Sequence, residues 1–471
     1  MINNKEMLAD KTEKKITTPI VDFVKEYAGM QNVRLHMPGH KGQSFLGCEQ
    51  LDITEIAGAD SLYESDGIIA ESERNAAKLF GTGRTFFSTE GSSQCIRAML
   101  YLAVQNWKRE KKKDITVSDK PLIVAARNVH KSFLYAAALL DLEVIWLWPE
   151  GGMDSLCSCV ISPQILEHTL NRLEPQQTRR LAAVYVTSPD YLGGMLDIQA
   201  LAVICHQHQT ILTVDNAHGA YLHFLEHPMH PMDLGADICC DSAHKTLPVL
   251  TGGAYLHISK SVSDALGKYA KEALALFGST SPSYLTMISL DMCNQYLAGE
   301  YRVRLSETIR QLNILKNQLK DAGWQLEGQE PLKLTICAPE GKTGIQMAEQ
   351  LREYKMECEY ADPQYLVCMM TCENTKEDME QLRTCLGVNH LPVSSRKQMQ
   401  PVKTLQKLSI REAVFSPHEK ILVKDAEGRI CGAPTVSCPP AIPIVVSGEM
   451  VDKNTLQICE YYGILYLDVV V

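Results

Sequence analysis

The chain has 471 residues, of which 46 are Lys or Arg and 56 are Asp or Glu, so its net charge is −10. A mildly acidic chain whose charges are spread along its length argues against a nucleic acid or an anionic membrane as the main partner. A hydrophobic fraction of 45% and a charged fraction of 22% exclude a disordered or collagen-like chain. This length predicts about two to four domains.

The 16 cysteines are scattered and form no CxxC pair, which argues against a small disulfide scaffold and a paired-CxxC zinc site. Reduced thiols that act as small buried hydrophobic groups are the simpler interpretation. Residues 1–15 are polar, and the longest apolar stretch, residues 132–148, is interrupted by Asp141 and Glu143. We therefore expect a cytoplasmic protein with no signal peptide, no membrane segment and no metal site.

Short apolar runs rich in β-branched residues alternate with helical stretches over the first part of the chain. The predicted strands are residues 122–126, 144–148, 181–187, 211–214, 236–240 and 254–258. The predicted helices are residues 95–104, 131–140 and 196–208. This alternation predicts an α/β fold with a mostly parallel central sheet and helices on both faces. Polar clusters follow several of the strands, at the edge where ligands bind in such sheets.

The pattern changes beyond residue 285. Residues 285–319 are predicted to be helical, with a single apolar stripe that suits a connection between a large and a smaller domain. Short strands at 332–338 and 365–372 then flank a predicted helix at 341–355, and residues 393–397 have the composition of a linker. The predicted division is an N-terminal segment 1–45, a large domain 46–300, a small α/β domain 301–392 and a C-terminal domain 393–471.

Two polar clusters suit a flat, phosphorylated ligand. Ser92 and Ser93 lie where a predicted helix begins, so hydroxyl groups, N–H groups and the helix dipole could together hold a phosphate. His130 follows the strand 122–126, and its planar ring could stack on a flat cofactor. Each feature alone also fits a common structural role, namely an ordinary helix cap and a hydrogen-bonded histidine in a turn.

Two further clusters complete a recognisable set. Asp215 lies at a strand end and could hold a protonated ring nitrogen, although such residues also cap turns. Lys245 lies between His244 and Thr246, shortly after Ser242, which suits a Schiff base beside a phosphate; a surface lysine in a loop is the alternative. A phosphate cup, a stacking ring, an acid and a lysine are together typical of a pyridoxal 5′-phosphate (PLP) site.

Longer strings give a more specific indication. The strongest are HMPGHK at 36–41 and SAHKTLP at 242–248. Supporting strings lie at 51–55, 84–87, 127–132, 187–191, 214–219, 279–284, 439–443 and 448–449. They resemble the ornithine/lysine/arginine decarboxylase family, PLP enzymes with the aspartate-aminotransferase-like fold (fold type I). The resemblance covers nearly the whole chain, whose length is similar to that of the compact biosynthetic members.

The resemblance implies roles for individual residues. The implied catalytic residues are Lys245 as the Schiff-base lysine, His130 as the stacking ring and Asp215 as the partner of the ring nitrogen, with His130 or Lys245 as proton donor. The implied cofactor-binding residues are Ser92, Ser93, His130, Asp215, Ala217, His218, Ser242, His244, Lys245, Thr280 and Ser281. Thr280 and Ser281 would reach the cofactor of a partner subunit, which implies a homodimer with active sites at the interface.

The implied reaction is decarboxylation of a basic amino acid to its amine in polyamine metabolism, with arginine favoured over lysine and ornithine. Family members carry a glutamate where this chain has Ala433, and that acid would suit the distal cation of the substrate. We expect another carboxylate, Glu90 or Glu449, to have taken over this contact; the alternative is a pocket for a less basic side chain. Asn216 also departs from the family, whose motif is usually Asp-Glu-Ala-His.

Two other functions remain as alternatives. The chain could catalyse another fold-type-I reaction such as transamination, in which case a keto acid would form instead of carbon dioxide. It could also be a non-catalytic binding or regulatory member of the family, in which case the purified protein would carry no chromophore.

Overall fold

The computed structural model describes residues 16–111, 116, 119–149, 155–394, 404–434 and 441–471. Its largest sheet has seven strands in the order β1-β7-β6-β5-β4-β2-β3. These strands are β1 (Arg84–Ser88), β2 (Leu122–Ala126), β3 (Glu143–Leu147), β4 (Leu181–Thr187), β5 (Ile211–Asp215), β6 (Ile238–Asp241) and β7 (Ala254–Ile258). The strands predicted from apolar runs are all present, with shifts of one or two residues at some ends.

The sheet is mostly parallel, as predicted. β2 pairs in parallel with β3 and β4, β4 with β5, and β5 with β6. β7 is the exception, because it runs antiparallel to both β1 and β6. A parallel pair of neighbouring strands needs a long crossover connection, usually a helix. The connection from β6 to β7 contains only the four-residue helix α8 (Ala243–Thr246), so β7 returns antiparallel to β6.

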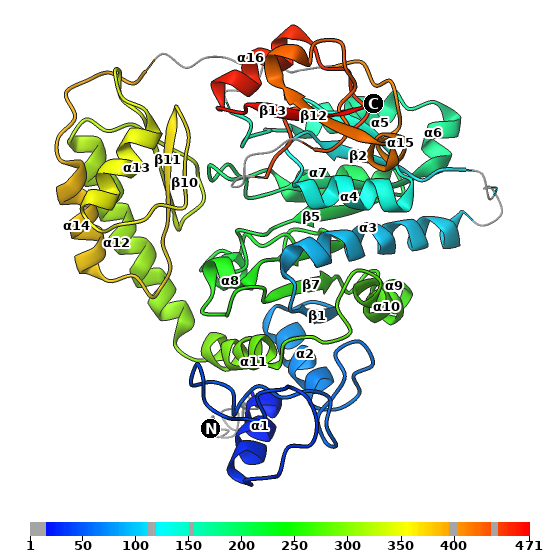
Figure 1. The fold of residues 1–471 in the computed structure, drawn as a ribbon, viewed down its shortest axis with the longest axis vertical. Helices are drawn as coiled ribbons and strands as arrows, with labels where there is room; N and C mark the ends of the chain where they lie inside the picture. The colour runs from blue at the N-terminus through cyan, green and yellow to red at the C-terminus, as the bar shows by residue number, and fades with distance from the viewer. Residues whose placement is uncertain (1–15, 112–115, 117–118, 150–154, 395–403, 435–440) are drawn as a thin grey trace, which may run out of the picture.

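Helices cover both faces of this sheet, as the α/β pattern predicted (Figure 1). α3 (Gly91–Glu110), α4 (Lys131–Leu140) and α10 (Ala270–Ala275) pack on one face, and buried alanines on α3 and α4 allow these helices to approach closely. α5 (Pro163–Asn171) and α7 (Ile198–Gln207) pack on the other face. The predicted helix 95–104 is the middle of α3, which extends beyond it at both ends.

The helical stretch predicted at 285–319 is two helices rather than one. α11 (Tyr284–Ala298) ends at Gly299, and α12 (Tyr301–Asp321) continues in a new direction towards the second sheet (Figure 1). That sheet has the order β10-β11-β9-β8, with β8 (Leu326–Glu327), β9 (Lys333–Cys337), β10 (Tyr360–Ala361) and β11 (Tyr365–Met369). α12 packs with α13 (Gly344–Glu353) and α14 (Lys376–Leu386) around the same buried core as its strands.

The C-terminal part lies against α4 of the large sheet. It contains α15 (Ile410–Phe415), α16 (Lys453–Tyr461) and the antiparallel pair of β12 (His418–Leu422) and β13 (Tyr466–Val470). The remaining elements are α1 (Pro19–Gly29), α2 (Ile68–Leu79), α6 (Pro175–Arg180), α9 (Ser263–Leu266) and the 3₁₀ turns η1 (Leu222–Phe224), η2 (Gly267–Tyr269) and η3 (Val423–Asp425).

Some predictions fall outside this description. The polar segment 1–15 and residues 395–397 of the predicted linker lie outside the described residues. The domain boundaries at 45, 300 and 392 stay predictions. Among the described helices, none is both long enough and apolar enough to cross a membrane.

Candidate active site

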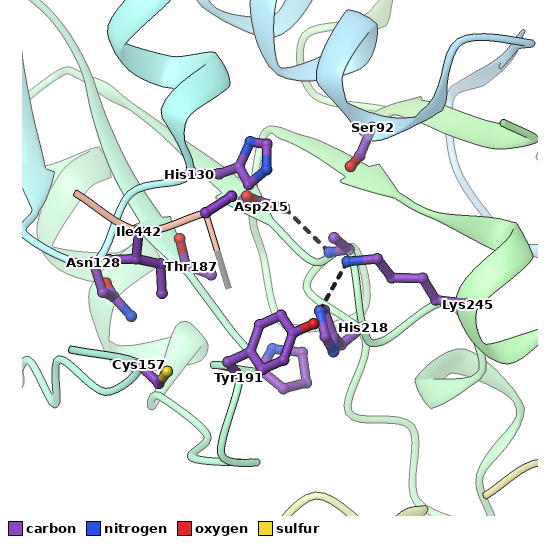
Figure 2. A pocket seen from close by; sticks show the side chains of 13 residues that line it. Ser92, Asn128, His130, Cys157, Thr187, Tyr191, Asp215, His218, Lys245 and Ile442 are labelled. Carbon is purple, nitrogen blue, oxygen red and sulfur yellow. Dashed lines mark hydrogen bonds between the residues drawn. The ribbon is translucent and has the colours of Figure 1, made fainter. Parts of the chain in front are cut away.

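A cavity of about 240 Å³ lies where β2, β4, β5 and β6 end (Figure 2). The carboxyl ends of parallel strands are the usual ligand site of such sheets. The side chains that line it come from loops far apart in the sequence: Ser92, Asn128, His130, Cys157, Thr187, Pro189, Tyr191, Asp215, Ala217, His218, Lys245, Ala441 and Ile442. The fold therefore brings the four predicted clusters together at one cavity.

Lys245 enters the cavity from α8, directly after β6. Its Nζ lies 2.9 Å from Nε2 of His218, and Figure 2 shows the two side chains meeting across the cavity. The other ring nitrogen of His218, Nδ1, lies 3.1 Å from Nζ of Lys333, a buried residue at the start of β9. Burial and the neighbouring Lys245 hold the pKa of His218 well below its usual range, so its ring is neutral.

Asp215 forms the floor of the cavity at the end of β5 and is 3% exposed. The Tyr185 hydroxyl donates to its Oδ2 over 3.2 Å, and the backbone N–H of Ala217 donates to its Oδ1 over 3.2 Å. Burial raises the pKa of Asp215, because a carboxylate is poorly solvated there. A cation on the cavity side, such as a protonated ring nitrogen, would stabilise its charged form.

His130 caps the N-terminus of α4, and its ring faces the cavity. The backbone N–H of Ser132 donates to its Nδ1 over 3.2 Å, so the proton of the neutral ring is on Nε2. Burial, and then the charge of Lys245, lowers the pKa of His130 to about 4. The ring is therefore neutral near pH 7, as suits a residue that stacks on a flat ring.

The predicted phosphate cup lies where α3 begins. Ser242 Oγ donates to Ser92 Oγ over 2.8 Å, which joins the first turn of α3 to the loop before Lys245. The backbone N–H of Gly91 donates to the carbonyl of Gly252 over 2.7 Å, and both glycines have a positive φ. A Cβ on Gly252 would lie 2.6 Å from the carbonyl oxygen of Thr89, so only glycine fits this close approach.

Two cavity residues have buried polar atoms without a hydrogen-bond partner among the described residues. These are both amide atoms of Asn128 and the hydroxyl of Thr187. Such groups are costly unless they are satisfied, so a polar ligand in the cavity is expected to bind them. Together with Asp215, Lys245 and the serine cup, this donor set fits the ring, aldehyde and phosphate of PLP.

Other predicted residues lie around the cavity rather than in its wall. Ser93 is half-buried on the first turn of α3, and the Nδ1–H of His244 donates to the Gly253 carbonyl over 3.0 Å. Thr280 and Ser281 are exposed in this single chain. Their predicted contact with a partner's cofactor stays a prediction.

Glu449 and Glu90, the two carboxylates expected to replace the family's glutamate at position 433, have different surroundings. Glu449 is 2% exposed, and its carboxylate pairs with Arg127 over 3.2 Å, so the prediction that it meets the substrate is wrong. Glu90 is exposed at the N-terminus of α3 and accepts a hydrogen bond from the backbone N–H of Ser279. It lies outside the cavity wall in one chain, next to the segment that contains Thr280.

A second buried cluster lies behind the cavity. Nε2 of His230 and Nε2 of His257 lie 2.9 and 3.1 Å from Oδ2 of Asp241. The backbone N–H of Met232 donates to Nδ1 of His230, so the neutral ring carries its proton on Nε2 and donates it to Asp241. That nitrogen has no lone pair for a metal. We therefore interpret this cluster as a hydrogen-bonded one.

Asp241 also explains one departure from the family pattern. Burial opposes its charge, but the two histidines hold the pKa of Asp241 well below its usual range. The amide of Asn216 donates to Asp241 Oδ1 over 2.7 Å. A glutamate at position 216 would bring a second carboxylate against Asp241, so an amide suits this position.

Several residues at the site carried no local signal in the sequence. Lys333 lies in an apolar stretch nearly ninety positions beyond Lys245, and the contact of β9 with the loop after β4, where Lys333 Nζ donates to the Asp190 carbonyl, brings it to His218. Asn128 and Thr187 lie inside strings that resembled the family, but nothing in the sequence distinguished them from their neighbours. Cys157 and Ile442 come from irregular segments without a predicted element.

Comparison with known proteins agrees with this geometry. The sequence profile of the Orn/Lys/Arg decarboxylase major domain matches residues 18–338, and that of the C-terminal domain of the same family matches residues 391–466. The chain belongs to this family. Orn/Lys/Arg decarboxylases are PLP enzymes, so the cofactor of this chain is pyridoxal 5′-phosphate and its enzyme class is that of the amino-acid decarboxylases.

Individual proteins support the assignment over most of the chain. An arginine decarboxylase from Bacillus anthracis is 28% identical, over 93% of this chain and 92% of that protein. A lysine decarboxylase from Francisella novicida has the same fold, with a TM-score of 0.79 at 17% identity over 97% of this chain and 81% of the other. A serine palmitoyltransferase from Sphingomonas wittichii shares the fold more distantly, with a TM-score of 0.52 at 17% identity over 79% of this chain and 84% of the other.

Proposed function

We propose that this Orn/Lys/Arg decarboxylase removes the α-carboxyl group of a basic amino acid, arginine before lysine or ornithine, and releases an amine that enters polyamine metabolism. The observation that carries the proposal is the meeting of Lys245, His130 and Asp215 at one cavity with the unsatisfied Asn128 amide. The preference for arginine is supported by the Bacillus relative, which is named an arginine decarboxylase and aligns over nearly its whole length.

In this proposal the residues around the cavity would hold the cofactor. Lys245 Nζ would bond its aldehyde, and His130 and Ala217 would pack against its ring. Asp215 would pair with the ring nitrogen, and Ser92, Ser93, Ser242 and His244 would bind the phosphate. When bound, the cofactor supplies the electron sink for the electron pair that carbon dioxide leaves behind. His218 orients Lys245 through the 2.9 Å contact.

The proton that replaces carbon dioxide comes from Lys245 in our proposal. The alternative donor, His130, has a pKa lowered to about 4 by burial, so it carries no acidic proton near pH 7. The amine of Lys245 lies at the cavity and can hold a proton at Nζ. The apolar side chains of Ala441 and Ile442 line the same cavity.

We also propose a homodimer in the cytoplasm. Thr280 and Ser281 are exposed in one chain, which agrees with the proposal that they contact a neighbouring subunit. The segment that carries the HMPGHK string exposes five large apolar side chains: Val33, Leu35, Met37, Phe45 and Leu46. Apolar surface of this kind is typical of a protein interface. The described cysteines are free thiols, which suits a reducing compartment.

The test is to incubate the purified protein and PLP with arginine, lysine and ornithine, and to measure carbon dioxide together with the amine. We expect both products in equal amounts from at least one of these substrates, and neither from Lys245→Ala. A keto acid in place of carbon dioxide would support the aminotransferase-like alternative. Absence of turnover with all three would contradict the proposal of a basic substrate.

A further inference from the structure

The carboxylate of Asp215 is held by donors from both strands that flank β5 in the sheet. On β4, the Tyr185 hydroxyl donates to Oδ2 over 3.2 Å. On β6, the Cys240 thiol donates to Oδ1 over 3.7 Å, and the backbone N–H of Ala217 donates to the same oxygen over 3.2 Å. Tyr185 and Cys240 are fully buried. Three donors therefore converge on one buried carboxylate at the cavity.

The ring of Tyr185 is itself fixed by packing. It lies against the ring of Phe133 on α4, with centroids 4.7 Å apart. The backbone N–H of Phe133 donates to the carbonyl of His130 over 2.9 Å, so Tyr185 connects Asp215 with the helix that His130 caps. A phenylalanine at position 185 would keep this packing. The hydroxyl therefore needs an explanation of its own, and its recorded partner is Asp215.

The protonation states around Asp215 make the phenol a donor. Titratable groups face Asp215 from each of four neighbouring elements: Tyr185 on β4, Cys240 on β6, Lys245 on α8 and Cys95 on α3. Burial raises the pKa of the phenol and of both thiols, so all three stay protonated near pH 7. An ionised carboxylate has acceptors alone. With a cationic ring nitrogen beside it, Asp215 is ionised, and the phenol donates to it.

Asp215 and a ring nitrogen would compete for one proton. Burial raises the pKa of Asp215, because its charge is poorly solvated, and this favours the proton on the carboxylate. The charge of Lys245 and the three hydrogen bonds act in the opposite direction. Lys245 gives up its ammonium when it bonds an aldehyde. The hydrogen bonds then have a larger share in keeping Asp215 ionised.

We propose that Tyr185 is a positioning residue, whose hydroxyl orients the carboxylate of Asp215 and stabilises its charged form, so that the proton shared with a bound ring nitrogen stays on the nitrogen. Tyr185 does not belong to the side chains that line the cavity, so it acts through Asp215. The inference deepens the proposed function and rests on Asp215 as the partner of the ring nitrogen.

The experiment measures the affinity of the full-length protein for PLP as a function of pH. Binding of a protonated ring nitrogen needs an ionised Asp215, so the affinity falls on the acid side as Asp215 takes up a proton. Loss of a donor raises the pKa of Asp215, so the acid-side midpoint of Tyr185→Phe should move upward by about one pH unit.

Tyr255→Phe is the matched control. Tyr255 is a fully buried tyrosine of β7 in the same sheet, and its hydroxyl has no hydrogen-bond partner within the described part of the chain. Its substitution should leave the midpoint of the wild type unchanged. The double variant Asp215→Asn with Tyr185→Phe should have the same pH profile as Asp215→Asn alone, because Tyr185 has no carboxylate left to act on.

The outcomes separate the inference from the function on which it rests. If the midpoint moves in Asp215→Asn but not in Tyr185→Phe, the role of Tyr185 is overturned and the pairing of Asp215 stands. If Asp215→Asn keeps the wild-type midpoint, both are overturned. A merely structural role would lower the affinity of Tyr185→Phe by the same factor at every pH, which also overturns the inference.

A second measurement decides if Tyr185→Phe does not fold. A ring-fluorinated tyrosine at position 185 is a stronger donor of nearly the same size, so it should move the acid-side midpoint downward. An unchanged midpoint in that protein overturns the role of the hydroxyl.

Discussion

Lys245 and Asp215 meet because β5 and β6 are neighbours and end at the same edge of the sheet. Asp215 is the last residue of β5, and Lys245 lies on α8, the short helix that follows β6. The surroundings then determine the chemistry of each residue. Burial lowers the pKa of His130 and of His218 and so favours their neutral forms. Burial raises the pKa of Asp215, so its carboxylate form is stabilised by a cation beside it.

Asp215→Asn tests the acid at the ring nitrogen. An amide cannot balance a positive charge there, so we expect the cofactor to bind but kcat to fall by about 10²- to 10³-fold, as for loss of one electrostatic stabiliser. The control is Asp237→Asn, a buried aspartate of the same sheet that accepts from the backbone N–H of Leu212 outside the cavity. Equal effects of the two substitutions on kcat would argue against a special role for Asp215.

Glu90→Gln tests the replacement acid. A charge-assisted hydrogen bond contributes about 1.5–3 kcal/mol, so its loss should lower kcat/KM for arginine by about ten- to more than a hundredfold. Ala433→Glu, which restores the family's acid, should raise kcat/KM. Glu110→Gln, at the opposite end of α3, is the control. If Glu90→Gln turns over arginine as the wild type does, another group binds the distal cation.

At the scale of elements, the C-terminal part contacts the loop between β2 and α4, which contains His130. Arg127, at the end of β2, donates to the carbonyls of Pro443 and Ile444 and pairs with Glu449. Its guanidinium also lies 5.1 Å from the ring centroid of Trp146. The backbone N–H of Lys131 donates to the carbonyl of Ala441, so the loop of His130 is fixed on both sides. These contacts hold the loop that carries His130 in place.

Glu449→Gln should therefore destabilise the protein and weaken cofactor binding. Removal of one partner of a buried ion pair costs about 3–5 kcal/mol, because it leaves a buried charge without compensation. Glu419→Gln is the control: its pair with Arg429 lies at the surface, and such pairs contribute about 0–1 kcal/mol. Thermal midpoints and PLP affinity of both variants are the measurements. A loss in Glu449→Gln no larger than in the control would contradict the account.

The sequence predicted these elements unevenly, for physical reasons. The strands at 122–126, 181–187 and 254–258 are continuous buried apolar runs, and their predicted bounds agree with the structure. The antiparallel direction of β7 depends on how the chain returns after Lys245, which no local pattern records. Lys333 was hidden because a charged residue at the start of an apolar strand looks like any strand end until its neighbours in space are known.

At the scale of the molecule, the surface around residues 33–46 is the feature that a single chain leaves unexplained. Leu35 and Leu46 are 90% and 89% exposed, although both are large apolar residues. The N-terminal segment lies at the end of the molecule opposite the C-terminal part (Figure 1). A homodimer that covers this segment would account for its composition.

A double substitution, Leu35→Asp with Phe45→Asp, tests this interface. Two carboxylates at an apolar contact should separate the subunits, so the mass in solution should fall from that of a dimer to that of one chain, with loss of activity. Val303→Asp is the control, because Val303 is also a strongly exposed apolar residue, 72% exposed, but lies on α12. A dimer that survives the double substitution would place the interface elsewhere, and a fully active wild-type monomer would exclude a shared site.

The position of the cofactor on the chain tests the central claim most directly. Borohydride reduction of the holoenzyme fixes the bond between the cofactor and its lysine, and peptide mass spectrometry then identifies the modified residue. We expect the cofactor on Lys245, in the peptide that contains SAHKTLP, and no modification in Lys245→Ala. A cofactor fixed to another lysine, such as Lys333 on the far side of His218, would contradict the account.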